Sequence, residues 1–262
     1  MTTIAVTGAA GRMGMRLVAL SKEYDALSLV AATERAGHPA AGQDAGEVAG
    51  VGRIGVAISA DLAVWPQVII DFTAPVATRK LLEVCCQKKV AMVIGTTGLL
   101  PADHALIDAA ALQIPILQAP NMSLGVNLLF KIAAQMAKAL GDDYDIEITE
   151  LHHRFKKDAP SGTAMGIADA ILEATDKTRD AVAYNRHGDD CPRKRGEIGM
   201  QSLRIGDEVG KHTVYFGALG ERLELTHTAT SRDTFAHGAL KAAVWLAGKP
   251  AGRYTMADVL DL

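Results

Sequence analysis

Short apolar runs alternate with helical patterns along the first 120 or so residues, and this alternation constrains the fold more than any other feature of the chain. The runs are TTIAVTG, LSLVAATE, VIIDF, VAMVIGTTG and IPILQAP. Amphipathic segments separate most of them, the first from Met13 to about Tyr24, whereas AGHPAAGQDAGEVAGVG has the composition of a long loop. Strands that alternate with helices at this spacing predict a parallel sheet covered by helices.

The pattern changes after Asn121. A long amphipathic helix, LGVNLLFKIAAQMAKAL, precedes the strand YDIEITELHH and a second helix, GIADAILEAT. Three glycine-punctuated, partly alternating segments follow, GEIGMQSLRIG, GKHTVYFGALG and ERLELTHTATS, which predict antiparallel strands. RDTFAHGALKAAVWLAGK ends the pattern as a helix. An α/β front and an α+β block suggest two domains, and the pattern leaves open whether the last helix returns to the first.

Composition excludes several classes of partner. The 262 residues are 49% hydrophobic and 22% charged with a net charge of -3, so we expect a substantial core and no general attraction to nucleic acid. No apolar run has the length of a membrane span, and the N-terminus does not read as a secretory signal. Cys85, Cys86 and Cys191 form no C-x-x-C pair, which favours the reducing cytoplasm and argues against a bound metal.

A glycine motif follows the first apolar run. VTGAAGRMG places Gly8, Gly11 and Gly14 between a strand and a helix. Glycine permits a tight turn and a close approach of the backbone to a pyrophosphate, which the N–H groups of the helix N-terminus attract. Glycine-rich turns are common, but this position in a strand-turn-helix unit indicates a nucleotide site.

Other residues sit where a dinucleotide would extend. Glu34 and Arg35 end the second run; Glu34 suits the two hydroxyls of an adenosine ribose, whereas Arg35 suits a 2′-phosphate, so the choice between NADH and NADPH stays open. GTTG, from Gly95, and APNMSLG, from Ala119, follow later runs at the expected C-terminal edge of the sheet. Either segment alone could be only a turn.

The stretch ELHHRFKKDAPSGTA concentrates the proton-active chemistry of the chain. A basic cluster from His152 to Lys157 follows a strand, and Ser161, Gly162 and Thr163 lead into a helix. Hydroxyls and backbone N–H groups at a helix N-terminus bind anions, and histidine and lysine transfer protons. We therefore expect a site for a small carboxylate substrate; the alternative is a solvated basic loop before a capped helix.

These motifs together resemble one family, 4-hydroxy-tetrahydrodipicolinate reductase (also called dihydrodipicolinate reductase) of bacterial and plant lysine biosynthesis. ELHHRFKKDAPSGTA is similar to the family signature E-x-H-H-x-x-K-x-D-x-P-S-G-T-A. VTGAAGRMG, IDFT, VIGTTG, APNMSLGVN and ERLELTHTATSRDTFAHGAL resemble its other landmarks in the same order, so the resemblance covers essentially the whole chain.

The resemblance implies an α/β fold: a Rossmann-like parallel-sheet nucleotide domain, residues 1–123 and 233–262, and an α+β mixed-sheet domain, residues 124–232, for substrate binding and tetramerisation. It implies a cytoplasmic homotetramer that binds a small dicarboxylate and no nucleic acid or membrane. The implied reaction is NAD(P)H-dependent reduction of 4-hydroxy-tetrahydrodipicolinate, through its dehydrated imine, to tetrahydrodipicolinate in the diaminopimelate route.

The resemblance also implies roles for individual residues. His152 matches the catalytic proton donor and acceptor and Lys156 the second proton donor, while His153, Gly162 and Thr163 match substrate contacts, to which the helix N-terminus adds Ser161. Contacts to NADH or NADPH are expected from Gly8, Ala9, Ala10, Gly11, Arg12, Met13, Glu34, Arg35, Gly95, Thr96, Thr97, Ala119, Pro120, Asn121 and Met122. Relatives frequently carry an aromatic residue at the position of Met122, which bears on nicotinamide stacking.

Three alternatives fit the sequence less well. Short-chain dehydrogenases use a Tyr-x-x-x-Lys pair, but none of the five tyrosines has a lysine four positions on. Semialdehyde dehydrogenases need a cysteine nucleophile, where this chain has Met122 and Ser123. A regulator that binds dinucleotide without catalysis would keep the glycines but would not need His152 and Lys156.

Overall fold

The computed structural model describes residues 1–262 and divides into two compact units. The first consists of Met1–Leu124 and Asp233–Leu262, so the C-terminal segment returns to the N-terminal unit. The second consists of Gly125–Arg232. No helix combines the length and hydropathy of a membrane span.

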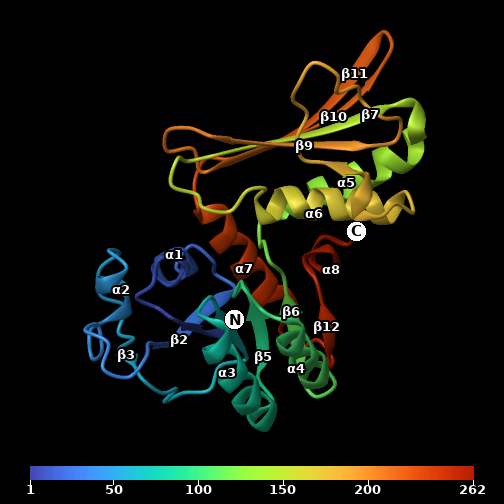
Figure 1. The fold of residues 1–262 in the computed structure, drawn as a ribbon. Helices are drawn as coiled ribbons and strands as arrows, with labels where there is room; N and C mark the ends of the chain where they lie inside the picture. The colour runs from blue at the N-terminus through green and yellow to red at the C-terminus, as the bar shows by residue number, and fades with distance from the viewer. The chain divides into compact units, whose positions relative to one another are not determined.

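A seven-stranded parallel sheet forms the centre of the first unit (Figure 1), which confirms the predicted fold class. Its spatial order is β12-β6-β5-β4-β1-β2-β3. The strands are β1 (Thr2–Thr7), β2 (Leu27–Thr33), β3 (Ile58–Ser59), β4 (Val68–Asp71), β5 (Ala91–Ile94), β6 (Pro115–Gln118) and β12 (Gly252–Tyr254). The order reverses direction between β1 and β4, the switch point at which open α/β sheets bind ligands.

Helices cover both faces of this sheet because its strands are apolar on both sides. Ile4 and Val6 of β1 pack into one core with α1 and α7, whereas Ile69 of β4 packs on the other face with α3 and α4. The helices are α1 (Arg12–Ser21), α2 (Ala45–Val48), α3 (Pro75–Lys88), α4 (Pro101–Ala111), α7 (Asp233–Leu246) and α8 (Met256–Leu260).

The expected long loop after β2 contains the short helix α2, so this part of the prediction was wrong. Asp44 caps the helix: its carboxylate accepts N–H groups from Gly46 at 2.8 Å and Glu47 at 3.3 Å, and from Ile54 at 3.0 Å and Gly55 at 2.7 Å across the loop. One side chain therefore orders a segment whose glycine content predicts only irregular structure.

A five-stranded mixed sheet forms the second unit, in the order β11-β10-β7-β9-β8. The strands are β7 (Asp145–His152), β8 (Val182–Ala183), β9 (Ile198–Arg204), β10 (Gly210–Ala218) and β11 (Glu221–Ala229). β10 is antiparallel to β7 and β11 as predicted, but β9 is parallel to β7 and β8, which corrects the prediction of three antiparallel strands. The segment between β7 and β9 is long enough for the crossover that a parallel pair requires.

Two long helices cover one face of the second sheet (Figure 1). They are α5 (Leu124–Leu140) and α6 (Gly162–Ala174), and two single turns of 3-10 helix, Gly141–Asp143 and Arg179–Ala181, complete the unit. Ile146 and Ile148 of β7 pack against Ile167 of α6 in its core. This helix-covered face carries the candidate substrate residues at one end.

Candidate active site

The turn after β1 is shaped so that only glycine fits at two positions. Gly8 has a φ of +66°, and its carbonyl oxygen accepts the N–H of Gly11 at 2.9 Å. A Cβ on Gly14, in the first turns of α1, would lie 2.0 Å from that same oxygen. The helix therefore packs directly on the turn and begins at Gly11 without a side-chain cap, which is the geometry of a pyrophosphate cradle.

The acid at the end of β2 lies beside this turn. The Glu34 carboxylate accepts the backbone N–H groups of Ala10 and Arg35, both at 3.1 Å. The side chain of Arg35 is exposed. Two residues that are 24 positions apart, Ala10 and Glu34, thus meet where a ribose would follow a bound pyrophosphate.

A cavity of about 340 Å³ opens at the C-terminal ends of β4, β5 and β6. Eight of the predicted cofactor residues line it: Arg12, Met13, Gly95, Thr96, Thr97, Pro120, Asn121 and Met122. Gly8 to Gly11, Glu34, Arg35 and Ala119 are not among its lining residues. The cavity is thus lined by the predicted cofactor residues that follow β5 and β6, together with Arg12 and Met13 at the start of α1.

Three residues of this cavity were missed from the sequence. Phe72 and Thr73 follow β4 in the same way that GTTG follows β5, so their position was a usable signal. Phe235, in α7, carried no such signal. Met122 itself is buried, and Phe72 and Phe235 supply the aromatic surface. A Cβ on Gly95 would lie 2.3 Å from the Phe72 ring, so glycine lets this ring lie against β5.

A fully buried carboxylate supports the same cavity. Asp71, at the end of β4, accepts four threonine hydroxyls: Thr7 at 2.7 Å, Thr73 at 2.6 Å, Thr78 at 2.6 Å and Thr96 at 3.1 Å. Thr73 and Thr96 also line the cavity. An aspartate that ends an otherwise apolar strand was the signal for this cluster, which ties β1, β4, β5 and α3 together.

In the second unit, the buried face of β7 changes from apolar to polar along its length. Alternation places Ile146, Ile148, Glu150 and His152 on one face, and all four are buried. Ile146 and Ile148 extend the core. Glu150 and His152 occupy the next two buried positions of the strand with ionisable side chains. Polar residues in the buried phase of a strand need partners, and the neighbouring strands provide them.

Strand register brings those partners to the same end of the sheet. His212 of β10 lies opposite Glu150, and Arg204 of β9 lies opposite His152. The Glu150 carboxylate accepts two guanidinium nitrogens of Arg204, at 2.8 and 2.9 Å, the backbone N–H of Ser161 at 3.1 Å, and a bond from His152 Nδ1. Burial raises the pKa of Glu150, but the bonds from His152 and Arg204 outweigh it and lower the pKa to about 2.

His212 completes the cluster as a neutral ring. It is buried, and its ring stands edge-on to His152 with the centroids 5.1 Å apart. Burial and the neighbouring His152 lower the pKa of His212 to about 3, so His212 is uncharged at neutral pH. Its Nε2 lies 3.0 Å from the hydroxyl oxygen of Ser161, which also accepts the N–H of Ala164 as the N-cap of α6. The Ser161 hydroxyl, predicted to face substrate, is thus engaged inside the protein.

The remaining predicted residues follow β7 in a turn that leads to α6. His153 donates its backbone N–H to Glu208 at 2.8 Å and accepts that of Lys156 at 3.1 Å. The Lys156 ammonium lies 2.9 Å from the Asp158 carboxylate, while Lys157 is exposed. A Cβ on Gly162 would meet nothing within 4 Å, so the first turn of α6 is open on that side.

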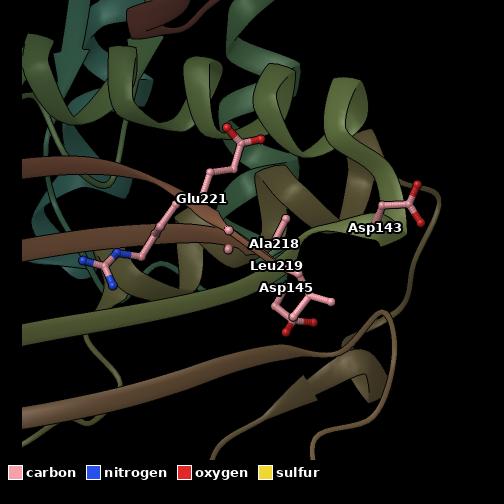
Figure 2. Close-up of a pocket in the computed structure, with 8 residues that line it drawn as sticks. Asp143, Asp145, Ala218, Leu219 and Glu221 are labelled. Carbon is pink, nitrogen blue, oxygen red and sulfur yellow. The ribbon is translucent and has the colours of Figure 1, made fainter.

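A second pocket lies at the opposite end of β7 and has the wrong charge for a dicarboxylate. Figure 2 shows the Asp143 and Asp145 side chains near the β10–β11 turn, and the pocket of about 610 Å³ is lined by these residues and by Gly217 to Arg222. Three of its lining side chains are carboxylates. No group of three histidine, cysteine or carboxylate residues is arranged to hold a metal ion.

Known proteins resemble the whole chain. The family description "Dihydrodipicolinate reductase, N-terminus" matches residues 2–122, and "Dihydrodipicolinate reductase, C-terminus" matches residues 125–260. The 4-hydroxy-tetrahydrodipicolinate reductase of Anaeromyxobacter sp. (strain Fw109-5) is 53% identical over 100% of this chain and 98% of the relative. That of Geobacter sulfurreducens is 51% identical over 100% of both chains. A solved dipicolinate-bound dihydrodipicolinate reductase from Paenisporosarcina sp. TG-14 shares the fold, with a TM-score of 0.74 and 23% identity over 98% of each chain.

Proposed function

Because the chain belongs to the dihydrodipicolinate reductase family and reduces 4-hydroxy-tetrahydrodipicolinate to tetrahydrodipicolinate with a nicotinamide dinucleotide, we propose the part that each of its residues plays in this step of lysine biosynthesis. The family resemblance of the sequence is thereby confirmed. The observation that carries the proposal is the histidine pair at the end of β7, one member of which is bonded to a buried glutamate.

His152 is the proton donor of the reaction. Dehydration of the substrate gives a conjugated imine, and reduction at a ring carbon sends negative charge toward the ring nitrogen, which must be protonated. Nδ1 of His152 is bonded to Glu150, so Nε2 is the atom left to exchange a proton with substrate. The Lys156 ammonium stabilises the developing charge and serves as the second donor.

Substrate carboxylates bind at the start of α6. Gly162 and Thr163 lie in the first turn of α6, where the positive end of the helix dipole favours anions, and His153 and Lys156 add polar and cationic side chains. Ser161 acts differently from the sequence prediction in this proposal: its hydroxyl caps the helix and thereby fixes the two N–H groups that follow. On binding, the Lys156 ammonium must exchange its contact with Asp158 for one with a substrate carboxylate.

The first unit binds the dinucleotide, which supplies the hydride when bound. The fit is supported by the close approach of Gly14 to Gly8, which leaves no room for a side chain and lets the backbone turn lie directly at the start of α1. Glu34 is already oriented by two backbone N–H groups toward a ribose diol, and the exposed Arg35 is free to meet a 2′-phosphate. We therefore propose that the enzyme uses both NADH and NADPH.

We also propose a cytoplasmic homotetramer built on the second unit. The sheet face opposite α5 and α6 carries Leu151 and Tyr215, both half-buried, and Leu203, which is 48% exposed. β11 is an edge strand, whose unpaired backbone groups favour pairing with another chain. Analytical ultracentrifugation of the wild type and of Leu203→Asp tests the assembly: a wild-type monomer contradicts it.

The catalytic roles are tested by His152→Ala and Lys156→Ala, with Lys157→Ala as the matched control on the exposed neighbour. Turnover is followed by substrate-dependent loss of NADH or NADPH absorbance at ~340 nm, with substrate generated enzymatically. Loss of a positioned proton donor typically lowers the rate about 10²–10⁴-fold, so both variants should fall in that range, while Lys157→Ala stays close to wild type. The Lys156 variant should also show a higher KM for substrate.

Combining the two substitutions adds a second constraint. The double variant should lose less than the product of the single losses, because both residues serve one proton-delivery step. Circular dichroism confirms that each variant is folded. Near-wild-type turnover in the folded single variants would make the cluster a substrate-holding loop without a catalytic role.

A further inference from the structure

We propose that Glu150 and Arg204 are positioning residues for His152: Arg204 holds the Glu150 carboxylate, and that carboxylate holds Nδ1 of the imidazole so that Nε2 faces the proton transfer. This inference deepens the proposed role of His152 and rests on it. Neither residue touches substrate in the proposed function. Their effect on the reaction passes through the imidazole of His152.

The first support is that the Glu150 carboxylate has no freedom left. Its Oε1 accepts Arg204 at 2.8 Å and the Ser161 N–H at 3.1 Å, while its Oε2 accepts Arg204 at 2.9 Å and His152 Nδ1. A carboxylate has about four acceptor sites, and all are used. Glu150 is only 1% exposed, so no water competes for these positions.

The second support is that Arg204 makes hydrogen bonds beyond its ion pair with Glu150. The Arg204 guanidinium also donates to the backbone oxygen of Asp158 at 2.6 Å and to that of Leu203 at 2.7 Å. Asp158 belongs to the turn that carries Lys156. Arg204 therefore ties both proposed proton donors to β9, one through Glu150 and one through the backbone of the turn.

The third support is the space left beside the other ring nitrogen. A Cβ on Gly210, the first residue of β10, would lie 3.0 Å from His152 Nε2 and 3.3 Å from Cδ2. Only a glycine at this position leaves Nε2 uncrowded. With Nδ1 fixed and Nε2 unobstructed, the ring has one orientation and one nitrogen for exchange.

Opposite charges flank the imidazole, and this arrangement has a measurable signature. The groups that face the cluster are Glu150 of β7, Arg204 of β9, neutral His212 of β10, His227 of β11 beyond it, and the Lys156–Asp158 pair of the following turn. Glu150 favours the protonated form of His152, and Arg204 opposes it. Removal of the Glu150 charge should therefore move the titration midpoint of His152 down, and removal of the Arg204 charge should move it up.

The experiment uses the full-length protein with Glu150→Gln, Arg204→Met and Arg204→Lys, and with Glu147→Gln as control. Glu147 lies on the same strand but on its other face, where its carboxylate pairs with Arg186 and Arg193. Titration of the His152 ring by NMR in ligand-free protein gives a readout that is independent of activity. The pH profile of kcat gives the catalytic readout.

Glu150→Gln should lower the NMR midpoint of His152, and Arg204→Met should raise it. The limb of the kcat profile on which the acid is lost should move in the same directions, with kcat reduced roughly ten- to a hundredfold. Arg204→Lys, which keeps the charge, should restore most of the wild-type midpoint, and Glu147→Gln should leave it unchanged. Should Glu150→Gln not fold, Arg204→Met and Arg204→Lys still make the comparison.

An unchanged midpoint in Glu150→Gln, or shifts of the same sign in the two charge-removing variants, would overturn the inference. Opposite NMR shifts without any movement of the kcat profile would uphold the positioning of the ring and refute His152 as the proton donor. In that way a failure of the proposed function is separated from a failure of this inference.

Discussion

Replacement of Asp71 by asparagine is a sharp test of how the nucleotide unit is held together. The carboxylate accepts two threonine hydroxyls on each oxygen, and it is fully buried. An amide of the same size keeps one oxygen and replaces the other with an N–H₂ group, which cannot accept a hydrogen bond. Whichever way the amide turns, two threonine hydroxyls lose their acceptor.

The magnitude follows from those two bonds. A hydrogen bond to a charged group contributes about 1.5–3 kcal/mol, so the loss of two gives a destabilisation of about 3 kcal/mol at the lower end of that range. The backbone oxygens of Ala74, 3.2 Å from the Thr78 hydroxyl, and of Ile70, 3.4 Å from that of Thr7, offset part of this cost. We therefore expect Asp71→Asn to lower the free energy of unfolding by about 2–3 kcal/mol.

Urea unfolding followed by tryptophan fluorescence measures this effect selectively, because Trp65 and Trp245 both belong to the first unit. Asp25→Asn, at an exposed carboxylate, is the matched control and should stay within about 0.5 kcal/mol of wild type. NADH should also bind Asp71→Asn more weakly, since Thr73 and Thr96 line the cavity. Equal unfolding midpoints for the two variants would refute the view that this cluster supports the unit.

Three further outcomes are expected. Arg35→Ala should raise the KM for NADPH about ten- to a hundredfold more than that for NADH, because a charge-assisted contact of ~1.5–3 kcal/mol is lost; equal effects would mean that Arg35 does not contact the phosphate. Pyridine-2,6-dicarboxylate should compete with substrate and bind more weakly at high salt, and calorimetry without any binding would contradict the anion site. Acid should destabilise the second unit in two steps. The pKa of His212 is lowered from 6.5 to about 3, so the free energy of unfolding decreases as pH falls below 6.5. The pKa of Glu150 is lowered from 4.5 to about 2, so a further decrease begins below pH 4.5. Acid titration of the free energy of unfolding should therefore show a smaller loss above pH 4.5 in His212→Asn than in wild type.

Local features of the chain were sufficient to predict much of the first unit. The strands are short, apolar on both sides and separated by helical patterns, and such strands form a parallel sheet because helices must cover both faces. The glycine turn could also be located from the sequence, because the contact that requires glycine joins Gly8 and Gly14, which lie within one segment of seven residues. The stretch from His152 to Thr163 was also readable, since a strand end, a basic turn and a helix N-cap are adjacent in sequence.

Contacts between distant strands could not be read in this way. The direction of β9 depends on the path of the crossover from β7, whereas alternation along the strand is the same in either direction. Arg204 and Glu150 are 54 positions apart in the sequence. Their pairing follows from the register between β7 and β9, which no local sequence pattern predicts. The sequence by itself determined which residues are candidates for the chemistry. Tertiary structure decided what holds them, because the partners of a buried charge are chosen by strand pairing and not by proximity along the chain.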